Sequence, residues 1–542
     1  MSTVEQKLDR YEKAKAIRAE SVDVLEEIGR FVWPSSQDMT GVVNRPEGQV
    51  RTQPVYSSTA RTSAQRLASG IFSFLMPVGV QWFQFVPQDA EDKADTNIIT
   101  WLAIASQAVQ SELWRSNFVR EMFTTIRSLA VFGTACISVE MDKVTKSIFF
   151  KSYHYGDIFY EVNNKGVIDT VFRRIHYTVR QAVMEFSLES LSKKIQDEYK
   201  DNKLNEKHEF VHIVAPQDDR KPEALDIKGK KFLGTWIEID EKLKVGEDGF
   251  DSQPYLVGRF DVAPNEIIGR SPSFDLLPEI RMLNDMRLAY IEGSEYAIHP
   301  ALMVWDDSVL GQPVTAPGGI LNLRPDSPEP KPLNTGFNSQ LGMESIKEQE
   351  RTVKDGNFND LFDALEDLRN MTATEADIRQ QSKLVILAPI VNGLQKELFD
   401  PLLIRVFDLL RNEPKRKTIT DAPKDFDYDV NYQGRLAVAM ATLQANATEG
   451  FLAKWSGYQE AFPVFDNVNI DDAFRRSGLS SGVPGDLFIK EEDRDKIRAD
   501  RAQRENAAQQ AELLASAASA YKDGSVAMQP NSLAEQVMGQ NG

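Results

Sequence analysis

Apolar residues recur at three- and four-residue steps in the first third of the chain, and this spacing predicts helices. The first helix is expected over residues 4–30, ending at the turn that begins with Trp33. A second is expected from a cap at Ser57 or Ser58 to Pro77, and a third over residues 97–128. The amino-terminal third is therefore predicted to be helical.

The pattern changes after Lys146 to alternating, β-branched and aromatic residues, which are typical of strands. A helix is expected over residues 179–199, between the second and third of these strands. Residues 146–262 are thus predicted to form a mixed α+β module. The strands are expected in SIFFKSYHYGDIFYEV, VIDTVFRRIHYTV, HEFVHIV, KFLGTWIEID and YLVGRFDV, with a turn at NNKG after the first.

A new helix is predicted at the segment GRSP, because Ser271 is a good helix cap and Pro272 suits the first helical position. We expect this helix to end at Ile298. Residues 300–337 then hold seven of the 25 prolines, which excludes most helix. An extended, exposed segment is predicted there, with short strands at LMVW and GILNL.

The remaining third is predicted to be helical again. Helix resumes near Ser339, and a long heptad-like helix with a kink at Pro389 is predicted to follow Thr374. A last helix is expected from Glu491 to Tyr521, and residues 523–542 are expected to be disordered. No repeat of fixed period occurs. The fold class predicted is α+β, mainly helical.

The composition of the 542 residues, 42% hydrophobic and 27% charged, is that of a globular chain with a large core. The single cysteine, Cys136, excludes a disulfide within the chain and is expected to be a buried apolar residue. The first residues lack the apolar core of a signal peptide, so we expect a cytosolic site of synthesis. Leu67–Gln88 is uncharged, but Pro77 and Gly79 interrupt it; a buried helix followed by a strand is expected rather than a membrane span.

The formal net charge is −18. Proteins whose whole surface binds nucleic acid carry an excess of Lys and Arg, because these residues displace counterions from the phosphates. This chain is therefore not predicted to hold nucleic acid over its whole surface. The negative charge remains compatible with a protein that lets DNA slide past it.

One motif is typical of an enzyme. His208, Glu209 and His212 match the pattern HExxH, in which two helical histidines bind zinc and the glutamate acts as a base. The β-branched residues that follow favour a strand, on which His208, Phe210 and His212 share a face without forming a metal site. Glu223 or Glu238 would have to serve as a distant third ligand. A zinc protease is kept as an alternative, and we expect no enzyme, no metal and no cofactor.

Other catalytic patterns are absent from the sequence. The three further histidines, His154, His176 and His299, stand in no recognisable nucleophile arrangement. No GxxxxGK[ST] segment occurs, so hydrolysis of a nucleoside triphosphate is not predicted. If DNA is moved, another protein supplies the motor.

Two long segments, GRSPSFDLLPEIRMLNDMRLAYIEGSEYAIHPALMV and NMTATEADIRQQSKLVILAPIVNGLQKELFDPLLIRVFDLL, resemble the portal family of tailed bacteriophages. The similarity is greatest to the head-to-tail connectors of short-tailed, podovirus-type phages. Two earlier segments, RTSAQRLASGIFSFLMPVGVQWFQF and IRSLAVFGTACISVE, fit the same family. The resemblance covers roughly residues 5–410 in consistent order, and no single motif in it is diagnostic.

The resemblance implies a ring, usually of twelve subunits, in which each subunit has a wing, a stem, a clip and a crown. By this similarity the chain divides into a wing at 1–268, a stem helix at 269–298, the clip at 299–337, a returning stem helix at 338–354, a tunnel-loop region at 355–373, a long wing helix at 374–412, a crown or carboxy-terminal helical region at 413–522 and the disordered tail at 523–542.

The resemblance also implies functional surfaces. An acidic channel would let DNA slide by repelling its phosphates evenly, and this interpretation is favoured over the alternative that the acidity only keeps the subunit soluble. Candidates for the DNA channel are Lys347, Arg351, Lys354, Asn357, Asn359 and Arg369. Candidates for the clip surface that meets terminase or tail are Trp305, Asp306, Asp307 and Arg324.

The partners implied are the other subunits of the ring, the terminase large subunit, the major capsid and scaffolding proteins, tail adaptor proteins, and double-stranded DNA bound without sequence preference. No membrane is implied. The expected location is the portal vertex of the virion, after assembly in the host cytoplasm. A tail adaptor or scaffold that lacks a channel is a second alternative to this interpretation.

Overall fold

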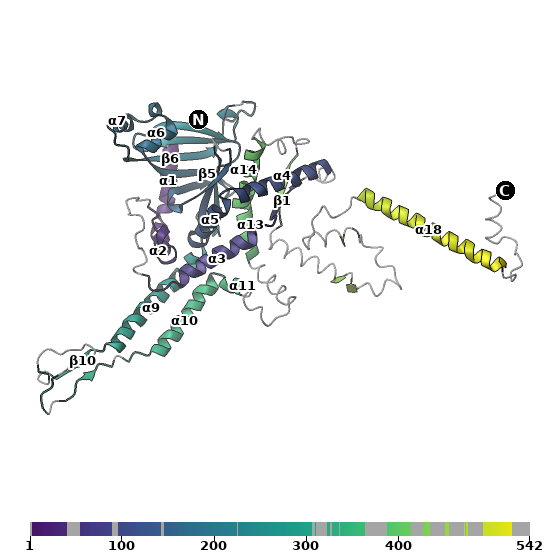
Figure 1. Ribbon diagram of the computed structural model, residues 1–542. Helices are drawn as coiled ribbons and strands as arrows, with labels where there is room; N and C mark the ends of the chain where they lie inside the picture. The colour runs from purple at the N-terminus through teal and green to yellow at the C-terminus, as the bar shows by residue number, and fades with distance from the viewer. Residues whose placement is uncertain are drawn as a thin grey trace. The chain divides into compact units, whose positions relative to one another are not determined.

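The computed structural model (Figure 1) places the described residues in two compact units, residues 1–437 and 438–542. The structure describes residues 3–40, 55–77, 79–88, 96–142, 146–224, 226–305, 309–310, 322–325, 328–334, 336–363, 387–412, 426–433 and 491–522, with positions 450–451, 453–454, 471 and 473–474.

A five-stranded antiparallel sheet forms the centre of the predicted α+β module. Its strand order is β4-β5-β6-β7-β8. Along β6 one set of side chains, including Phe210, packs under the helices α6 and α7, while the alternate set, including Val211, packs under α1. The bounds are β4 Ile158–Val162, β5 Ile168–Thr178, β6 Lys207–Pro216, β7 Phe232–Glu238, β8 Leu243–Phe250, α1 Val4–Ala19, α6 Val179–Phe186 and α7 Lys193–Lys200.

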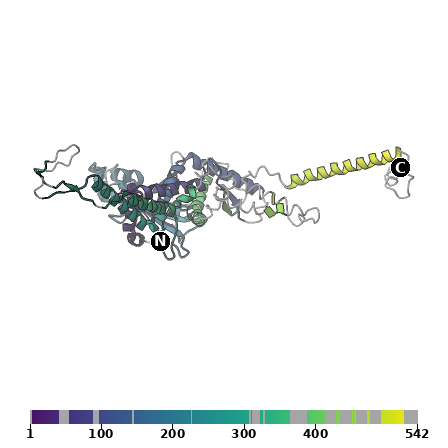
Figure 2. The same cartoon turned by 90° about the horizontal axis from the view of Figure 1, so that it is seen from below.

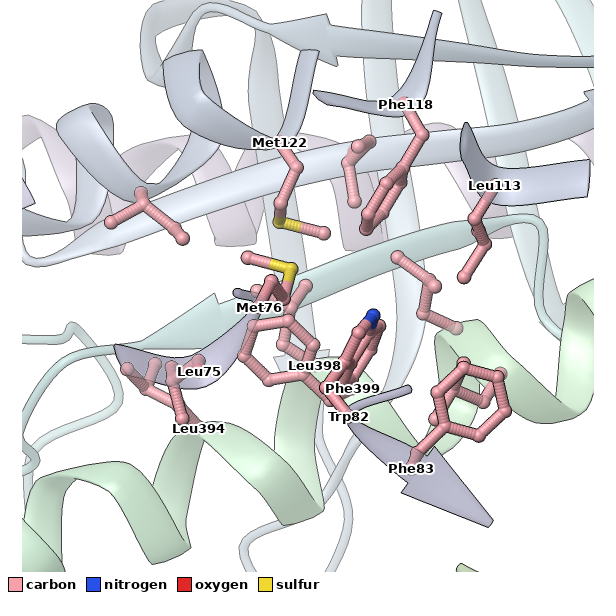
Figure 3. Close-up of a cluster of buried hydrophobic side chains, with 14 of the residues drawn as sticks. Leu75, Met76, Trp82, Phe83, Leu113, Phe118, Met122, Leu394, Leu398 and Phe399 are labelled. Carbon is pink, nitrogen blue, oxygen red and sulfur yellow. The ribbon is translucent and has the colours of Figure 1, made fainter. Parts of the chain in front are cut away.

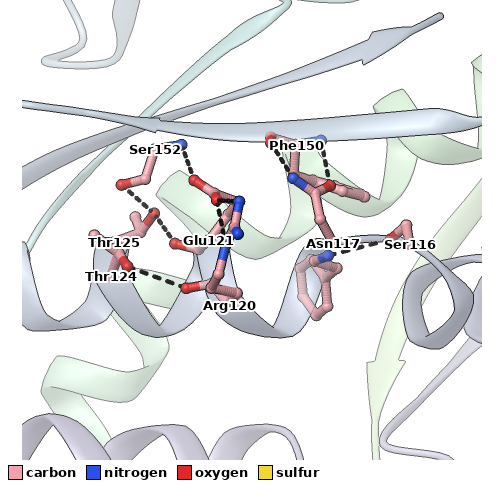
Figure 4. Close-up of polar contacts among 9 residues, drawn as sticks. Ser116, Asn117, Arg120, Glu121, Thr124, Thr125, Phe150 and Ser152 are labelled. Carbon is pink, nitrogen blue, oxygen red and sulfur yellow. Dashed lines mark hydrogen bonds and ion pairs between the residues drawn. The ribbon is translucent and has the colours of Figure 1, made fainter.

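A second sheet of three strands lies against helix α5, Phe118–Phe132, which precedes it in the chain. Its order is β3-β2-β9, with β2 Thr134–Met141, β3 Ile148–Tyr153 and β9 Tyr255–Arg259. Polar side chains join the helix to the edge strand β3 (Figure 4). The Asn117 amide donates to the carbonyl of Phe150 at 2.7 Å and accepts from its N–H at 2.9 Å, while Glu121 accepts from the N–H of Ser152 at 2.9 Å.

The largest core lies between helices from both ends of the first unit. Trp82, which is 1% exposed, packs beside Phe83 and Phe399, and Leu75, Met76, Leu394 and Leu398 surround them (Figure 3). The elements around this core are α3 Thr59–Leu75, β1 Phe83–Pro87, α4 Thr96–Arg115, α13 Ala388–Leu394, the π-helical turn Gln395–Phe399, α14 Asp400–Arg411 and β12 Tyr428–Tyr432, which pairs with β1.

Most sequence predictions of helices and strands are confirmed. The predicted first helix is two helices, α1 and α2 Val22–Val32, and the predicted helix over 179–199 is also two. The uncharged segment 67–88 is a buried helix end followed by β1, as expected, and among the described helices none is long and apolar enough to cross a membrane. Cys136 is buried. The β region starts earlier than predicted, because β2 begins at Thr134, and β8 and β12 were not predicted.

The GRSP segment packs against the end of α5 through two glycines. Gly133 closes α5 with a left-handed backbone, φ 76°, and a Cβ added there would lie 2.3 Å from the carbonyl oxygen of Gly269. The Ser271 hydroxyl donates to the carbonyl of Val131 at 2.7 Å instead of capping its own helix. Pro272 opens α8, Pro272–Asp275, as predicted. This contact fixes where the next long helix leaves the body.

In the second unit the main described element is α18, Glu491–Lys522, which confirms the last predicted helix. The Asp471 carboxylate accepts from Arg498 Nη1 at 2.6 Å and lies 3.4 Å from Arg494 Nη1. The predicted disordered tail at 523–542 lies outside the described residues.

Candidate channel and docking surfaces

Two antiparallel helices, α9 Leu277–Ile298 and α10 Ser339–Gly356, project side by side from the body of the first unit (Figures 1 and 2). Their inner faces carry the buried residues Ile280, Leu283, Ile346 and Val353. An ion pair between Arg287 and Glu350 crosses the pair. The predicted ends of these helices, at residue 298 for the first and residues 338 and 354 for the second, lie within two residues of the observed ends.

Two contacts hold the helices near each other at their outer end. A Cβ on Gly293 would lie 2.6 Å from the ring of Phe337, and a Cβ on Gly342 would lie 3.0 Å from the ring of Tyr290. The rings of Tyr290 and Phe337 pack edge to face, with centroids 5.5 Å apart. The glycines therefore give room for two aromatic side chains between the backbones.

The inner ends of the helices are attached to the body by polar contacts. Arg281 donates to both carboxylate oxygens of Glu27 on α2, at 2.6 and 2.5 Å. Hydrogen bonding from this guanidinium lowers the pKa of the Glu27 carboxyl. The Asn357 side chain donates to Ser63 Oγ of α3 at 3.1 Å. Both helices of the pair thus have a fixed root.

The outer end of the pair is joined by the Pro-rich segment, which contains the short antiparallel strands β10 Leu302–Met303 and β11 Lys331–Pro332. The N–H of Leu333 extends this pairing by donating to the carbonyl of Ala301 at 2.8 Å. An isolated bridge also joins Val309 to Leu323. The strand predicted at LMVW is confirmed, and of the segment GILNL only its last residues lie within the described ranges.

This outer hairpin exposes apolar side chains. Trp305 is 72% exposed and Met303 52% exposed, and Leu302 and Val304 are exposed beside them. Neighbouring exposed apolar residues are costly in water and mark surfaces that contact a partner. Of the other predicted clip residues, Arg324 is exposed, while Asp306 and Asp307 lie outside the described residues.

The predicted channel residues divide into two groups. Lys347, Arg351 and Lys354 are exposed on the outer face of α10. Asn357 and Asn359 are buried, 0% and 4% exposed, at the root of the pair, so their side chains are not available to DNA in this subunit. That part of the prediction is corrected: Asn357 serves the contact with α3. Arg369 lies outside the described residues.

The HEFVH segment lies on β6, as predicted, and not on a helix. His208 Nε2 lies 2.5 Å from Glu198 Oε2, whereas His212 Nδ1 lies 2.7 Å from the Tyr255 hydroxyl and its ring stacks on Trp236 at 3.9 Å. Burial, with a smaller contribution from the Arg173 cation, holds the pKa of His212 well below its ordinary value. Both rings are thus engaged in packing and in hydrogen bonds inside the subunit.

The third ligand that zinc would need is also engaged elsewhere. Glu238 is buried and accepts a hydrogen bond from the N–H of Ser192 at 3.2 Å. Within the described ranges, no group of three or more His, Cys, Asp or Glu side chains is placed to hold a metal ion. The zinc protease alternative has no support in this geometry.

A cavity of about 500 Å³ lies between the start of α1 and the sheet. Its cations are paired within the subunit: Lys7 Nζ donates to Thr235 at 2.7 Å, Arg10 Nε donates to Glu161 at 3.0 Å, and Lys244 lies 2.9 Å from Glu247. Arg10 and Lys244 are therefore paired with carboxylates of the subunit, and Lys7 is hydrogen-bonded to a neutral hydroxyl.

Sequence reasoning missed the apolar residues on the outer faces of the helix pair. Tyr296 is 61% exposed, Leu341 62% and Met282 48%. Met282 and Tyr296 lie fourteen residues apart on α9, outside the stripe that packs against α10. The sequence did contain a signal for a second contact surface, because these apolar residues fall outside the stripe that packs against the neighbouring helix.

Sequence comparisons give a family and relatives that cover most of the chain. Residues 5–489 match the sequence profile of the family described as "Bacteriophage head to tail connecting protein". The "Probable portal protein" of Bordetella phage BPP-1 is 24% identical over 529 residues, which cover 96% of this chain and 95% of that protein. The "Portal protein" of Salmonella phage epsilon15 is 24% identical over 497 residues, which cover 89% and 88%.

Proposed function

We propose that this chain, which belongs to the family of bacteriophage head to tail connecting proteins, is a portal subunit that assembles into a ring around a DNA channel. The full-length similarity to two proteins named as portal proteins supports this role. In the proposed role the ring replaces one capsid vertex, and DNA enters through it during packaging and leaves through it at ejection. The family is structural, and its role here involves no catalytic residue.

One observation carries the proposal: a helix pair that leaves the body and ends in a hairpin with an exposed apolar tip. Among the described residues of the hairpin, β10 and β11 pair over two residues each, and Trp305 and Met303 are exposed. Such a segment gains little from its own subunit. Contact with neighbouring subunits would bury its apolar side chains and pair its open strand edges.

The division into functional regions follows from this proposal. Residues 269–298 and 338–354 are the two stem helices, residues 299–337 are the clip, and the body at 1–268 with residues 374–412 is the wing. Residues 355–373 form the tunnel-loop region, and residues 413–522 form the crown. The clip, with Trp305 and Arg324, is proposed to meet the terminase large subunit and later the tail adaptor proteins.

The part of the outer face of α10 that carries Arg351 is proposed to face the channel. Its Arg351 side chain is 83% exposed, and Arg351 Nε lies 3.5 Å from Asp355 Oδ2. Glu344 and Glu348 are exposed on the same helix. A face on which acids alternate with bases offers isolated phosphate contacts without a continuous basic strip, so it releases few counterions and lets DNA slide.

The proposed surroundings are those of a virion component. Major capsid and scaffolding proteins would contact the wing at the portal vertex, and assembly would take place in the host cytoplasm. Twelve copies are proposed for the ring, and double-stranded DNA would be bound without sequence preference.

Electron microscopy of the purified full-length chain tests the proposal. We expect closed rings with a central opening wide enough for duplex DNA. Filaments, monomers or discs without an opening would contradict it and would favour a tail adaptor or scaffold. A Trp305→Ser variant should form fewer rings at the same concentration, because it removes the largest exposed side chain of the clip.

A further inference from the structure

The outer face of α9 has the pattern of a helix that packs against another helix. Met282, Ala289 and Tyr296 are exposed and lie at seven-residue spacing, and Asp285 lies between the first two on the same face. This face points away from Leu283 and from α10. It therefore requires a partner that presents both apolar and basic groups.

Asp285 has no ion-pair partner among the described residues of the subunit. The ion pairs of α9 are made by Arg281 with Glu27 and by Arg287 with Glu350. On the outer face of α10, Arg351 forms an ion pair with Asp355. Lys347 is exposed on the same face and has no ion pair in the described ranges. Asp285 and Lys347 are thus an acid and a base without an ion pair in the described ranges, as are Glu292 farther along α9 and Lys354 farther along α10.

The register of the pair puts these two residues at the same height. Leu276 contacts Gly356, and Tyr290 contacts Gly342. The two contacts are fourteen residues apart on each helix, so the antiparallel helices α9 and α10 advance in step between them. Asp285 lies nine residues beyond Leu276, and Lys347 lies nine residues before Gly356. Rotation about a ring axis that runs along the helices preserves this height, and each copy then brings its Lys347 level with a neighbour's Asp285.

We propose that the outer face of α9, with Asp285 between Met282 and Ala289, docks against the Lys347 side of α10 in the next copy of this chain. The interface is heterologous: one subunit contributes the acidic-apolar face and its neighbour contributes the basic one. Lys347 then serves subunit contact, and Arg351, which has its own carboxylate in Asp355, remains for the channel. This inference rests on the proposed ring and assigns the surface that closes it.

Cross-linking between introduced cysteines tests the contact directly. Cys136, the single natural cysteine, is buried, and burial raises the pKa of its thiol, so it reacts slowly with maleimides. In the full chain carrying Asp285→Cys and Lys347→Cys, a short bismaleimide should give a ladder of covalent multimers on a denaturing gel. The matched control is Asp285→Cys with Thr352→Cys, because Thr352 is exposed on the opposite flank of α10; it should give at least about tenfold less product.

Charge exchange gives a second, independent measurement. Asp285→Lys or Lys347→Asp alone should raise the protein concentration needed for half-assembly at least about tenfold, since each creates like charges at every interface of the ring. The two changes together should restore assembly. Glu185→Lys, an exposed change of the same sign on α6, is the control and should leave assembly unchanged.

The outcomes separate the two proposals. If the natural chain forms no rings, the proposed function fails and this inference fails with it. If rings form but cross-links appear only within single chains, or if the charge variants assemble normally, the α9–α10 contact is wrong and the portal role stands. Normal rings with altered DNA passage in Lys347→Asp would also overturn the contact, because Lys347 would then face the channel.

Discussion

At the residue scale, the contact between Gly133 and Gly269 determines where the projecting helices attach to the body. Gly133→Ala should destabilise the subunit by about 3 kcal/mol or more, because a left-handed φ is strained for alanine and the new Cβ would collide with backbone. Chemical denaturation measures this change.

Gly166 provides a matched control for that variant. Its φ is 78°, close to the 76° of Gly133, but a Cβ there would meet nothing within 4 Å. Gly166→Ala should therefore lose only the part due to strain, about 1 kcal/mol. Equal losses in the two variants would show that the close approach to Gly269 contributes nothing.

His212 makes the stability of the body depend on pH. The pKa of His212 is depressed in the folded state. Just below the ordinary pKa, the imidazole is therefore protonated in the unfolded chain but not in the folded chain. Stability is complete above the ordinary pKa of about 6.5 and falls as the pH drops below it, by up to about 1.4 kcal/mol per pH unit. Urea unfolding at several pH values between 5 and 7 should show this slope, and His212→Gln should remove it. An unchanged slope in that variant would assign the effect to other groups.

Individual residues also show what the sequence could and could not predict. The β-branched residues after His208 were enough to predict a strand, and β6 confirms this prediction. The burial of Asn357 was not predictable, since it depends on Ser63, which lies 294 positions earlier in the chain. An asparagine beside charged residues at a helix end carries no local signal of such a contact.

At the scale of elements, the π-helical turn Gln395–Phe399 connects the carboxy-terminal helices to the β module. Pro401 follows it, and proline removes an N–H and crowds the carbonyl four residues earlier, which accounts for a widened turn before it. Glu397 in the turn accepts from Arg259 of β9, whose backbone N–H donates at 3.2 Å and whose Nε donates at 3.1 Å. A kink was predicted at Pro389 instead, which stands in the first turn of α13.

Removing the carboxylate of this pair should be costly. The Arg259 side chain is only 6% exposed, so Glu397→Ala would leave a buried cation without its anion and should cost about 3 kcal/mol of folding free energy. Lys396→Ala, the neighbouring change, removes the 67% exposed partner of Asp400 and should cost less than about 1 kcal/mol. Thermal or urea unfolding compares them, and similar losses would contradict a special role for the Arg259 pair.

Strands that pair over long sequence distances were the hardest elements to predict. The first six residues of β2 are all buried, so the strand lacks the alternation that reveals a half-exposed strand. β12 is a short segment whose pairing with β1 joins the two ends of the first unit. Helices such as α3 and α10 were predicted nearly to their ends, because their caps, prolines and apolar spacing are local signals.

At the scale of the whole molecule, substitutions of two tryptophans should have different effects: one on the folding free energy of the subunit and the other on ring assembly. Trp82 is 1% exposed in the main core, and Trp305 is 72% exposed on the outer hairpin. Trp82→Ser should cost about 3–5 kcal/mol of folding free energy, because it empties the centre of the core. Trp305→Ser should change that free energy by less than about 0.5 kcal/mol. Unfolding of the dilute subunit measures both, and a large loss in Trp305→Ser would show that the clip belongs to the subunit core.

The family could be predicted from the sequence, since long segments in consistent order carry that information. The proposed surface between subunits could not be predicted, because Met282, Tyr296 and Leu341 look like ordinary scattered apolar residues until their positions on the helix pair are known. Their common feature is a position on the outer side of a helix whose inner side is already occupied.

The fixed root of the α9–α10 pair gives the clip a mechanical property. Leu276 and Gly356 are in contact where the helices meet the body, while the hairpin lies beyond 22 residues of α9. With a length of about 33 Å, a tilt of about 5° at the root moves the tip by about 3 Å. A push on the hairpin would compress one helix and stretch the other. The pair therefore acts as a rigid arm, through which a small rearrangement in the body shifts the outer hairpin sideways.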